Sequence, residues 1–153
     1  MSMRPSLTYD EVAVGDALPE LVLPITRTLV VAGAIASRDY QDVHHDPVLA
    51  VKRGSPDIFM NILTTNGLVG RYLTDWTGPA GIIRSIAIRL GAPNYPEDTM
   101  TLTGRVSALA GPEEDPGGDA HRGTVEVTVR GANRLGDHGT GTVTVSLPLG
   151  GGS

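Results

Sequence analysis

The chain has 153 residues, of which 40% are hydrophobic and 19% charged, and it carries a formal net charge of −5. This length suits one ordinary globular domain, and the acidic charge disfavours a nucleic-acid partner, whose phosphates need clustered lysine and arginine. The absence of cysteine excludes disulfides, thiolate zinc sites and cysteine nucleophiles, and without an apolar signal or spanning segment we expect a cytoplasmic protein with no membrane partner.

The first third of the chain predicts one strand and one short helix. Residues 1–19 mix proline and glycine with isolated apolar positions and are typical of an extended arm. Residues 21–30 predict a strand, in which Pro24 indicates a sheet edge or a bulge. The alanine-rich residues 31–40 favour a short helix that runs into the polar segment 41–47.

A long helix is predicted next. Ser55 is a suitable N-cap and Pro56 a suitable first helical residue, and apolar residues then recur at spacings of three and four as far as Trp76. The helix is apolar on several sides, Tyr72 and Trp76 included, as expected of a helix wrapped by a sheet.

The second half of the chain changes to the period of a strand. Apolar and polar residues alternate over 99–108, 124–130 and 142–147, which predicts half-buried antiparallel strands. Residues 82–90 predict a further strand, and its more apolar composition favours a central place in the sheet.

This order of elements predicts an α+β hot-dog fold, in which an antiparallel sheet is wrapped around a long central helix. We expect a single domain over residues 1–149 and a flexible tail over 150–153. The polar segment 111–119 is expected to be a hairpin loop without a functional role. An open sheet leaves an edge strand in need of a partner, which favours an oligomer.

The junction between the short helix and the polar segment carries the candidate chemistry. Asp39 and His44 are five residues apart, and a turn can bring them together. A carboxylate and an imidazole that converge on one water can act as general base and proton donor. From spacing alone, a solvated turn whose side chains cap backbone groups is the alternative.

Other titratable residues offer weaker alternatives. His45 could replace His44 in the chemistry. A metal site built from His44, His45 and Asp46 is disfavoured, because adjacent histidines in extended chain point in different directions and no further ligand has a suitable spacing. Asp42 is expected to cap the loop, and His138 to face solvent from a hairpin.

The segment from Ser37 to Pro47 resembles the signature of the MaoC-like dehydratases, the hydratase-2 family of enoyl-CoA hydratases. In that family the signature runs Gly-Asp, any residue, Asn-Pro, an apolar residue, His, any residue, Asp-Pro. Its Asp and His fall on Asp39 and His44. The departures from the signature are Arg38, Gln41 and Asp42.

A narrower resemblance is to the smaller MaoC-like subunits of the actinobacterial steroid side-chain enoyl-CoA hydratases, carried by residues 38–46, 57–63 and 135–138. It implies hydration of an α,β-unsaturated steroid acyl-CoA thioester in cholesterol-type side-chain degradation. It also implies a heteromer with a second MaoC-like subunit, with an associated thiolase or aldolase as a further partner. No metal or redox cofactor is implied, because coenzyme A is part of the substrate.

The same resemblance assigns roles to residues. Asp39 and His44 would activate water for attack on the β-carbon, and a backbone N–H at the start of the long helix would stabilise the enolate oxyanion. The family's His-Gly pair at that start matches Asp57 and Ile58, so Ile58 N–H is the candidate donor, with a purely structural core role as the alternative. Four basic residues could contact the phosphates of coenzyme A or, alternatively, only solvent, namely Lys52, Arg53, Arg84 and Arg89.

Two rival functions follow from the same sequence. The first is a homodimeric (R)-specific hydratase of ordinary fatty enoyl-CoA, which would be active without a partner. The second is a non-catalytic hot-dog subunit that gives its partner only structure or part of a binding tunnel. A hot-dog thioesterase is disfavoured, because the Asp39 and His44 pair has the hydratase spacing.

Overall fold

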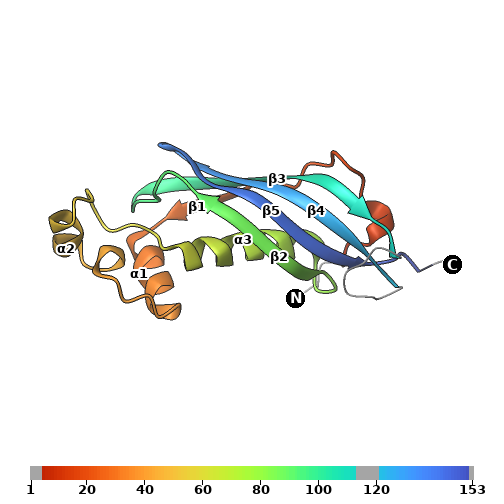
Figure 1. Ribbon diagram of the computed structural model, residues 1–153, viewed down its shortest axis with the longest axis horizontal. Coiled ribbons are helices and arrows are strands. Elements are labelled where there is room, and N and C mark those ends of the chain that lie inside the picture. The colour runs from red at the N-terminus through yellow and green to blue at the C-terminus, as the bar shows by residue number, and fades with distance from the viewer. Residues whose placement is uncertain (1–4, 113–120, 152–153) are drawn as a thin grey trace.

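The computed structural model describes residues 5–112 and 121–151, and it contains one sheet with helices on one side and at one end (Figure 1). Its α-helices are α1 (Arg27–Ala36), α2 (Pro47–Lys52) and α3 (Ile62–Thr77), and its short 3-10 helices are η1 (Tyr9–Glu11) and η2 (Asp42–His44). Its strands are β1 (Leu21–Ile25), β2 (Ile82–Leu90), β3 (Asp98–Ala110), β4 (Arg122–Asn133) and β5 (Gly136–Pro148).

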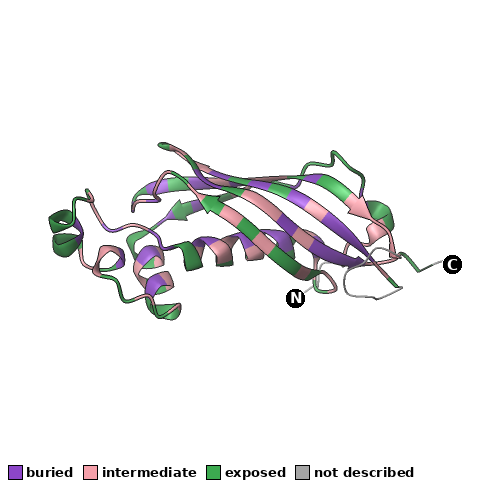
Figure 2. Ribbon diagram, in the orientation of Figure 1, coloured by how far each residue is buried: buried purple, intermediate pink, exposed green. Residues whose placement is uncertain are grey.

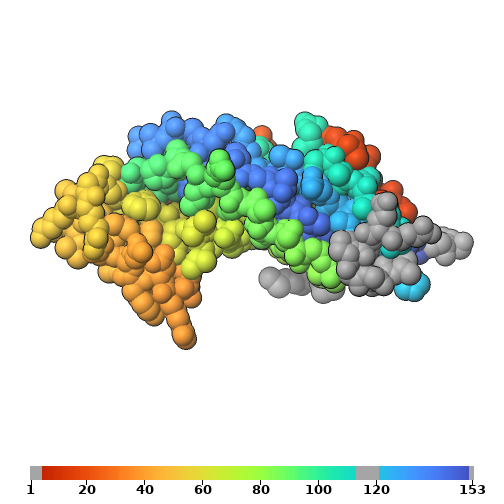
Figure 3. All heavy atoms as spheres, viewed as in Figure 1, coloured from red at the N-terminus to blue at the C-terminus, as the bar shows by residue number. Residues whose placement is uncertain are grey.

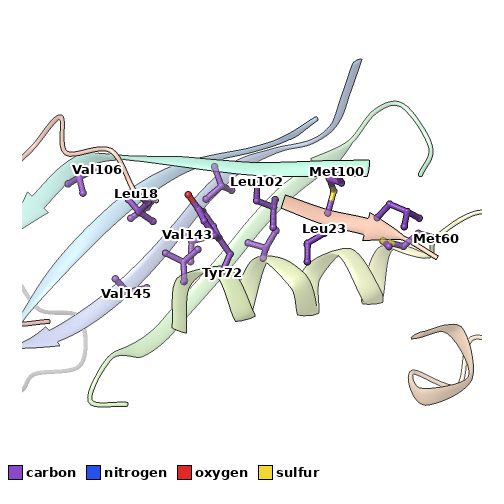
Figure 4. Close-up of a cluster of buried hydrophobic side chains, with 14 of the residues drawn as sticks. Leu18, Leu23, Met60, Tyr72, Met100, Leu102, Val106, Val143 and Val145 are labelled. Atoms are coloured by element: carbon purple, nitrogen blue, oxygen red, sulfur yellow. The ribbon is translucent and has the colours of Figure 1, made fainter. Parts of the chain in front are cut away.

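The five strands form an antiparallel sheet in the order β1-β3-β4-β5-β2, and α3 lies across one face of it. Leu102 of β3 and Val143 of β5 lie beside Tyr72 of α3 (Figure 4), and buried residues of β4 and Leu73 of α3 belong to the same core. The strand residues of this core are Leu23, Ile25, Met100, Leu102, Val106, Val125, Val127, Val129, Val143, Val145 and Leu147. This arrangement confirms the predicted α+β fold.

The sheet covers one side of α3. The buried residues of the helix are Thr65, Val69, Tyr72, Leu73 and Thr77, all on the face towards the sheet. The other side is open, as the green and pink segments of α3 in Figure 2 show. Ile62 and Leu63 there are 45% and 49% exposed. Some of the apolar residues that lie on several sides of α3 are therefore not covered by the sheet.

The predicted start of the long helix is wrong by six residues. The helix begins at Ile62, because the Asn61 side chain accepts a hydrogen bond from Thr64 N at 3.0 Å and caps the first turn. The Ser55 hydroxyl instead donates to the backbone oxygen of Asp57 at 2.6 Å, within a non-helical segment.

Side-chain caps also explain two differences in the first third. Thr26 accepts from Leu29 N at 3.0 Å, so the strand ends at Ile25 and α1 begins about one turn earlier than predicted. Asp46 accepts from Val48 N and Leu49 N and starts α2, a short helix that the sequence did not indicate.

The two edge strands are β1 and β2. The edge position expected from Pro24 is confirmed, whereas the central position expected for residues 82–90 is wrong. The strand is apolar on both faces because Ile83 and Ile86 pack against the core while Ile82 is 43% exposed. Among the described residues, β5 is the one strand that pairs with β2, so one edge of β2 is free.

The remaining segments add little to the site. The expected hairpin loop 111–119 lies mostly outside the described residues, as do residues 152–153 of the expected tail. Leu149 N donates to His121 O at 2.8 Å, and Gly150 N donates to the Asp10 carboxylate. Across residues 5–112 and 121–151, no helix is both long and apolar enough to cross a membrane.

Candidate active site

Asp39 and His44 meet at the end of the molecule where α1, η2 and α2 extend beyond the sheet (Figures 1 and 3). Asp39 follows α1 and is anchored by its N–H, which donates to Ala34 O at 2.9 Å. His44 ends η2, and its Nε2 lies 3.4 Å from Asp39 Oδ2. The structure thus brings together the two side chains that the sequence singled out.

The orientation of the His44 ring follows from its other nitrogen. Nδ1 lies 2.7 Å from the backbone oxygen of Phe59, which can only accept a hydrogen bond. We therefore assign the proton of the neutral ring to Nδ1, which leaves the Nε2 lone pair directed towards Asp39. The side chain is 8% exposed, and the Phe59 ring packs edge-on at 5.0 Å. His44 is thus held as a base with its acceptor atom towards the carboxylate.

Asp39 is held in its charged form. Asn61 Nδ2 donates to its Oδ2 at 3.0 Å, and Gln41 N lies 3.4 Å from its Oδ1. The hydrogen bond from Asn61 is the largest cause of a lowered Asp39 pKa, with smaller contributions from Gln41 N–H and the His44 charge and partial opposition from burial. At neutral pH Asp39 is therefore a carboxylate, whose oxygens can accept a hydrogen bond from water.

Asn61 is a site residue that the sequence reasoning missed. The predicted helix over 56–76 put it inside the helix, where an asparagine has no special role. A signal was present, because an asparagine directly before a run of helix-compatible residues is a common N-cap. Read that way, Asn61 lies at the helix start, beside the end of α1.

Ile58 does not lie at a helix start. It is 1% exposed, and its N–H donates to the carboxylate of its neighbour Asp57 at 2.7 Å. Arg27 holds the same carboxylate through two hydrogen bonds of 3.0 and 2.6 Å, which is the largest cause of a lowered Asp57 pKa. Ile58 was expected to donate to the oxyanion because it would lie at the start of the long helix, and this expected position is wrong.

The other polar residues of the loop point elsewhere. His45 Nε2 lies 3.1 Å from Tyr40 O, and Asp46 caps α2, so neither converges with His44 on a metal position. No group of three or more metal-ligating side chains occurs in the part of the chain that the structure describes. Asp42 pairs with Arg53 at 2.7 Å, and the hydrogen bond from Arg53 is the largest cause of its lowered pKa.

The expectation that His138 faces solvent is wrong. The residue is 1% exposed, with Nδ1 2.7 Å from Ala92 O and Nε2 2.9 Å from the Thr65 hydroxyl. The side chain points from β5 towards α3, where two polar groups satisfy the ring. Burial lowers the His138 pKa, against a smaller opposite effect of the hydrogen bond to Ala92 O.

The aromatic and basic residues singled out in the sequence differ in how far they are buried. Tyr72 is buried in the core and Trp76 packs against it partly exposed, as expected. Arg53 is engaged by Asp42, and Lys52, Arg84 and Arg89 are exposed. A contact between these basic residues and coenzyme A stays a prediction.

Comparisons with known proteins identify relatives of this chain. No family model matches it. It is 50% identical over 134 residues to the 3-oxo-4,17-pregnadiene-20-carboxyl-CoA hydratase beta subunit of Mycobacterium tuberculosis, a match that covers 88% of this chain and 95% of that protein. A chain in the crystal structure of the ChsH1-ChsH2 complex from Mycobacterium tuberculosis is 49% identical, with a TM-score of 0.79 over 88% of this chain and 98% of that one.

A more distant structure shares the fold. The MaoC-like dehydratase from Rhodospirillum rubrum is 20% identical, with a TM-score of 0.77 over 94% of this chain and 98% of that one. The predicted hot-dog architecture is thereby confirmed. The chain belongs to the family of the 3-oxo-4,17-pregnadiene-20-carboxyl-CoA hydratase beta subunit and has the fold of the MaoC-like dehydratases.

Proposed function

We propose that this chain is the catalytic subunit of an enoyl-CoA hydratase, and that the acyl group is a steroid side chain. The observation that carries the proposal is the pairing of Asp39 Oδ2 with His44 Nε2 at 3.4 Å, in a chain 50% identical to a steroid acyl-CoA hydratase subunit. Both atoms can accept a hydrogen bond from one water, which orients its oxygen for attack.

In this proposal His44 Nε2 takes a proton from the water as the oxygen bonds to the β-carbon of the substrate. The thioester carbonyl becomes an enolate, and collapse of the enolate forms a bond between the α-carbon and a proton returned from the site. One water is added across one double bond, with no change in electron count. We therefore propose that no metal or redox cofactor takes part and that coenzyme A enters only with the substrate.

The enolate oxygen needs hydrogen-bond donors, and the start of α3 supplies them. We propose that backbone N–H groups at Asn61 and Ile62 fill the role first given to Ile58. Asn61 is the N-cap and Ile62 the first residue of a 16-residue helix, whose dipole favours negative charge at this end. Asn61 also contacts Asp39 directly, so this helix start lies next to the proposed water position.

A second MaoC-like subunit is the proposed partner. Apolar residues that are more than 40% exposed support it at two separate places, Ile62 and Leu63 at the start of α3 and Ile82 at the start of β2. A free sheet edge and exposed apolar side chains are typical of surfaces buried in an oligomer. We extend the proposal to a cytoplasmic location and to a thiolase or aldolase that works with the complex.

The test is hydration of enoyl-CoA thioesters, followed by loss of the conjugated thioester absorbance. The purified chain is assayed alone and with a second MaoC-like subunit, on short-chain and on steroid substrates. We expect activity on the steroid thioester in the mixture. Activity of the chain alone on short chains would favour a homodimeric hydratase, and no activity in any mixture would favour a structural subunit.

A further inference from the structure

We propose that Asn61 is a positioning residue for the hydration reaction, because its side-chain amide holds the Asp39 carboxylate in place and ties it to the start of α3. This inference rests on the proposed function. It adds a residue outside the Asp39 and His44 pair.

All the hydrogen-bonding groups of the Asn61 amide are used. Its Oδ1 accepts from Thr64 N at 3.0 Å and from the Thr64 hydroxyl at 2.6 Å. Its Nδ2 donates to Ser37 Oγ at 2.9 Å and to Asp39 Oδ2 at 3.0 Å. A flipped amide would set oxygen against the carboxylate and nitrogen against Thr64 N–H, so this orientation is the one that satisfies every partner.

Burial makes this arrangement rigid. Asn61 is 2% exposed, and Ser37 is itself fixed because its hydroxyl donates to Gly33 O at 2.7 Å. Asp39 is thus held by a side chain that caps one helix and contacts the end of another. The oxygen that accepts from Asn61 is the one that faces His44, so the amide fixes the atom that the reaction needs.

The electrostatic consequence concerns the charge on Asp39. Hydrogen bonds to a carboxylate favour its ionised form, and Asn61 is the largest contributor to the lowered Asp39 pKa. His44, from η2, is the one titratable group among the described residues that contributes to it. Nearby Asp42 is paired with Arg53 and Asp57 with Arg27. Loss of the Asn61 amide should therefore raise the Asp39 pKa.

Two substitutions separate this role from helix capping. Asn61→Ser keeps a good N-cap but is too short to reach the carboxylate, and Asn61→Asp keeps the cap while setting a second carboxylate against Asp39. The matched control is Thr26→Ala, which removes the N-cap of α1 away from Asp39. All three proteins are checked for folding by circular dichroism.

Two measurements are made on each protein. One is the titration of the Asp39 carboxyl by carbon-13 NMR of the full chain, assigned with Asp39→Asn. The other is the pH profile of kcat/KM for steroid enoyl-CoA hydration in the complex with the second subunit.

We expect Asn61→Ser to raise the Asp39 pKa, to move the acidic limb of kcat/KM to higher pH and to lower kcat/KM about tenfold. Asn61→Asp should raise the pKa further, and Thr26→Ala should move neither. An Asp39 titration that is unchanged in Asn61→Ser would overturn the inference. If the pKa rises but wild-type protein hydrates no enoyl-CoA in any mixture, the hydrogen bond from Asn61 to Asp39 is confirmed, whereas the proposed function fails and with it the role of Asn61 in hydration.

Discussion

Gly33 offers a sharp test of how α1 is packed against the start of α3. A Cβ at this position would lie 2.9 Å from Thr64 Cγ2 and closer still to the Thr64 hydroxyl. Thr64 cannot turn away without loss, because that hydroxyl donates to Asn61 Oδ1. Gly33→Ala should therefore push α1 away from the helix start that holds Asp39.

The expected change in the free energy of unfolding can be compared with that of an alanine substitution at a second glycine of the same kind, Gly67. An alanine inside a helix gains roughly 1 kcal/mol over glycine, and overpacking costs about 1–3 kcal/mol, so Gly33→Ala should lose about 1 kcal/mol net. Gly67 lies on the exposed side of α3, and no atom lies within 4 Å of the place that an alanine methyl group would take there. Gly67→Ala should therefore gain about 1 kcal/mol.

The assay is urea unfolding of the purified chain, with hydratase activity measured in the complex. Gly33→Ala should lower the free energy of unfolding and reduce activity, while Gly67→Ala should raise stability. In a double variant, Thr64→Ala should recover part of the Gly33→Ala loss, because it removes the overlapping atoms. If Gly33→Ala stabilises the chain as much as Gly67→Ala, the close contact between α1 and α3 is refuted.

Two further predictions concern buried polar groups. Because burial lowers the folded His138 pKa below the unfolded value of 6.5, the unfolded chain takes up the proton first. The free energy of unfolding should therefore be highest above pH 6.5 and decrease as the pH falls below it, by up to about 1.4 kcal/mol per pH unit. Urea unfolding of His138→Gln at several pH values should show a weaker decrease. Tyr72 has a buried hydroxyl without a partner among the described residues. Tyr72→Phe should therefore raise the free energy of unfolding by about 1 kcal/mol. A decrease of about 1 kcal/mol would instead show that the hydroxyl has a hydrogen-bond partner.

The sequence carried enough information to locate the candidate pair of Asp39 and His44. Asp39 and His44 lie within one short segment, so a local turn decides whether they meet, and motif spacing reports on that turn. The strands of the second half were also predictable, because alternation directly reflects a sheet with one buried face.

Features that depend on distant segments were not predictable in the same way. His138 looked like a solvent-facing hairpin residue because its partners, Thr65 and Ala92, are remote in sequence. The strand 82–90 has the apolar composition of a central strand, although Ile83, Ile86 and Ile88 pack on the core while Ile82 is exposed at the sheet edge.

The misplaced helix start had a local cause with consequences for the site. Ser55 and Pro56 form a good start signal, but Asn61 offers a second one nearer the apolar face that packs on the sheet. Burial of Val69 and Leu73 sets the register of α3, and this register decides which cap is used. For this reason the proposed oxyanion donors are the backbone N–H groups of Asn61 and Ile62, in place of that of Ile58.

The most direct test of the central claim is the hydration rate of the steroid enoyl-CoA thioester by the complex with Asp39→Asn or His44→Ala in this chain. Each variant is first shown to fold and to bind the second subunit, so that a loss of rate reports on chemistry. We predict that either change lowers kcat by about 10²–10⁴-fold, as expected when a group that activates water is removed. Full activity of both variants would contradict the assignment and make this chain a structural subunit.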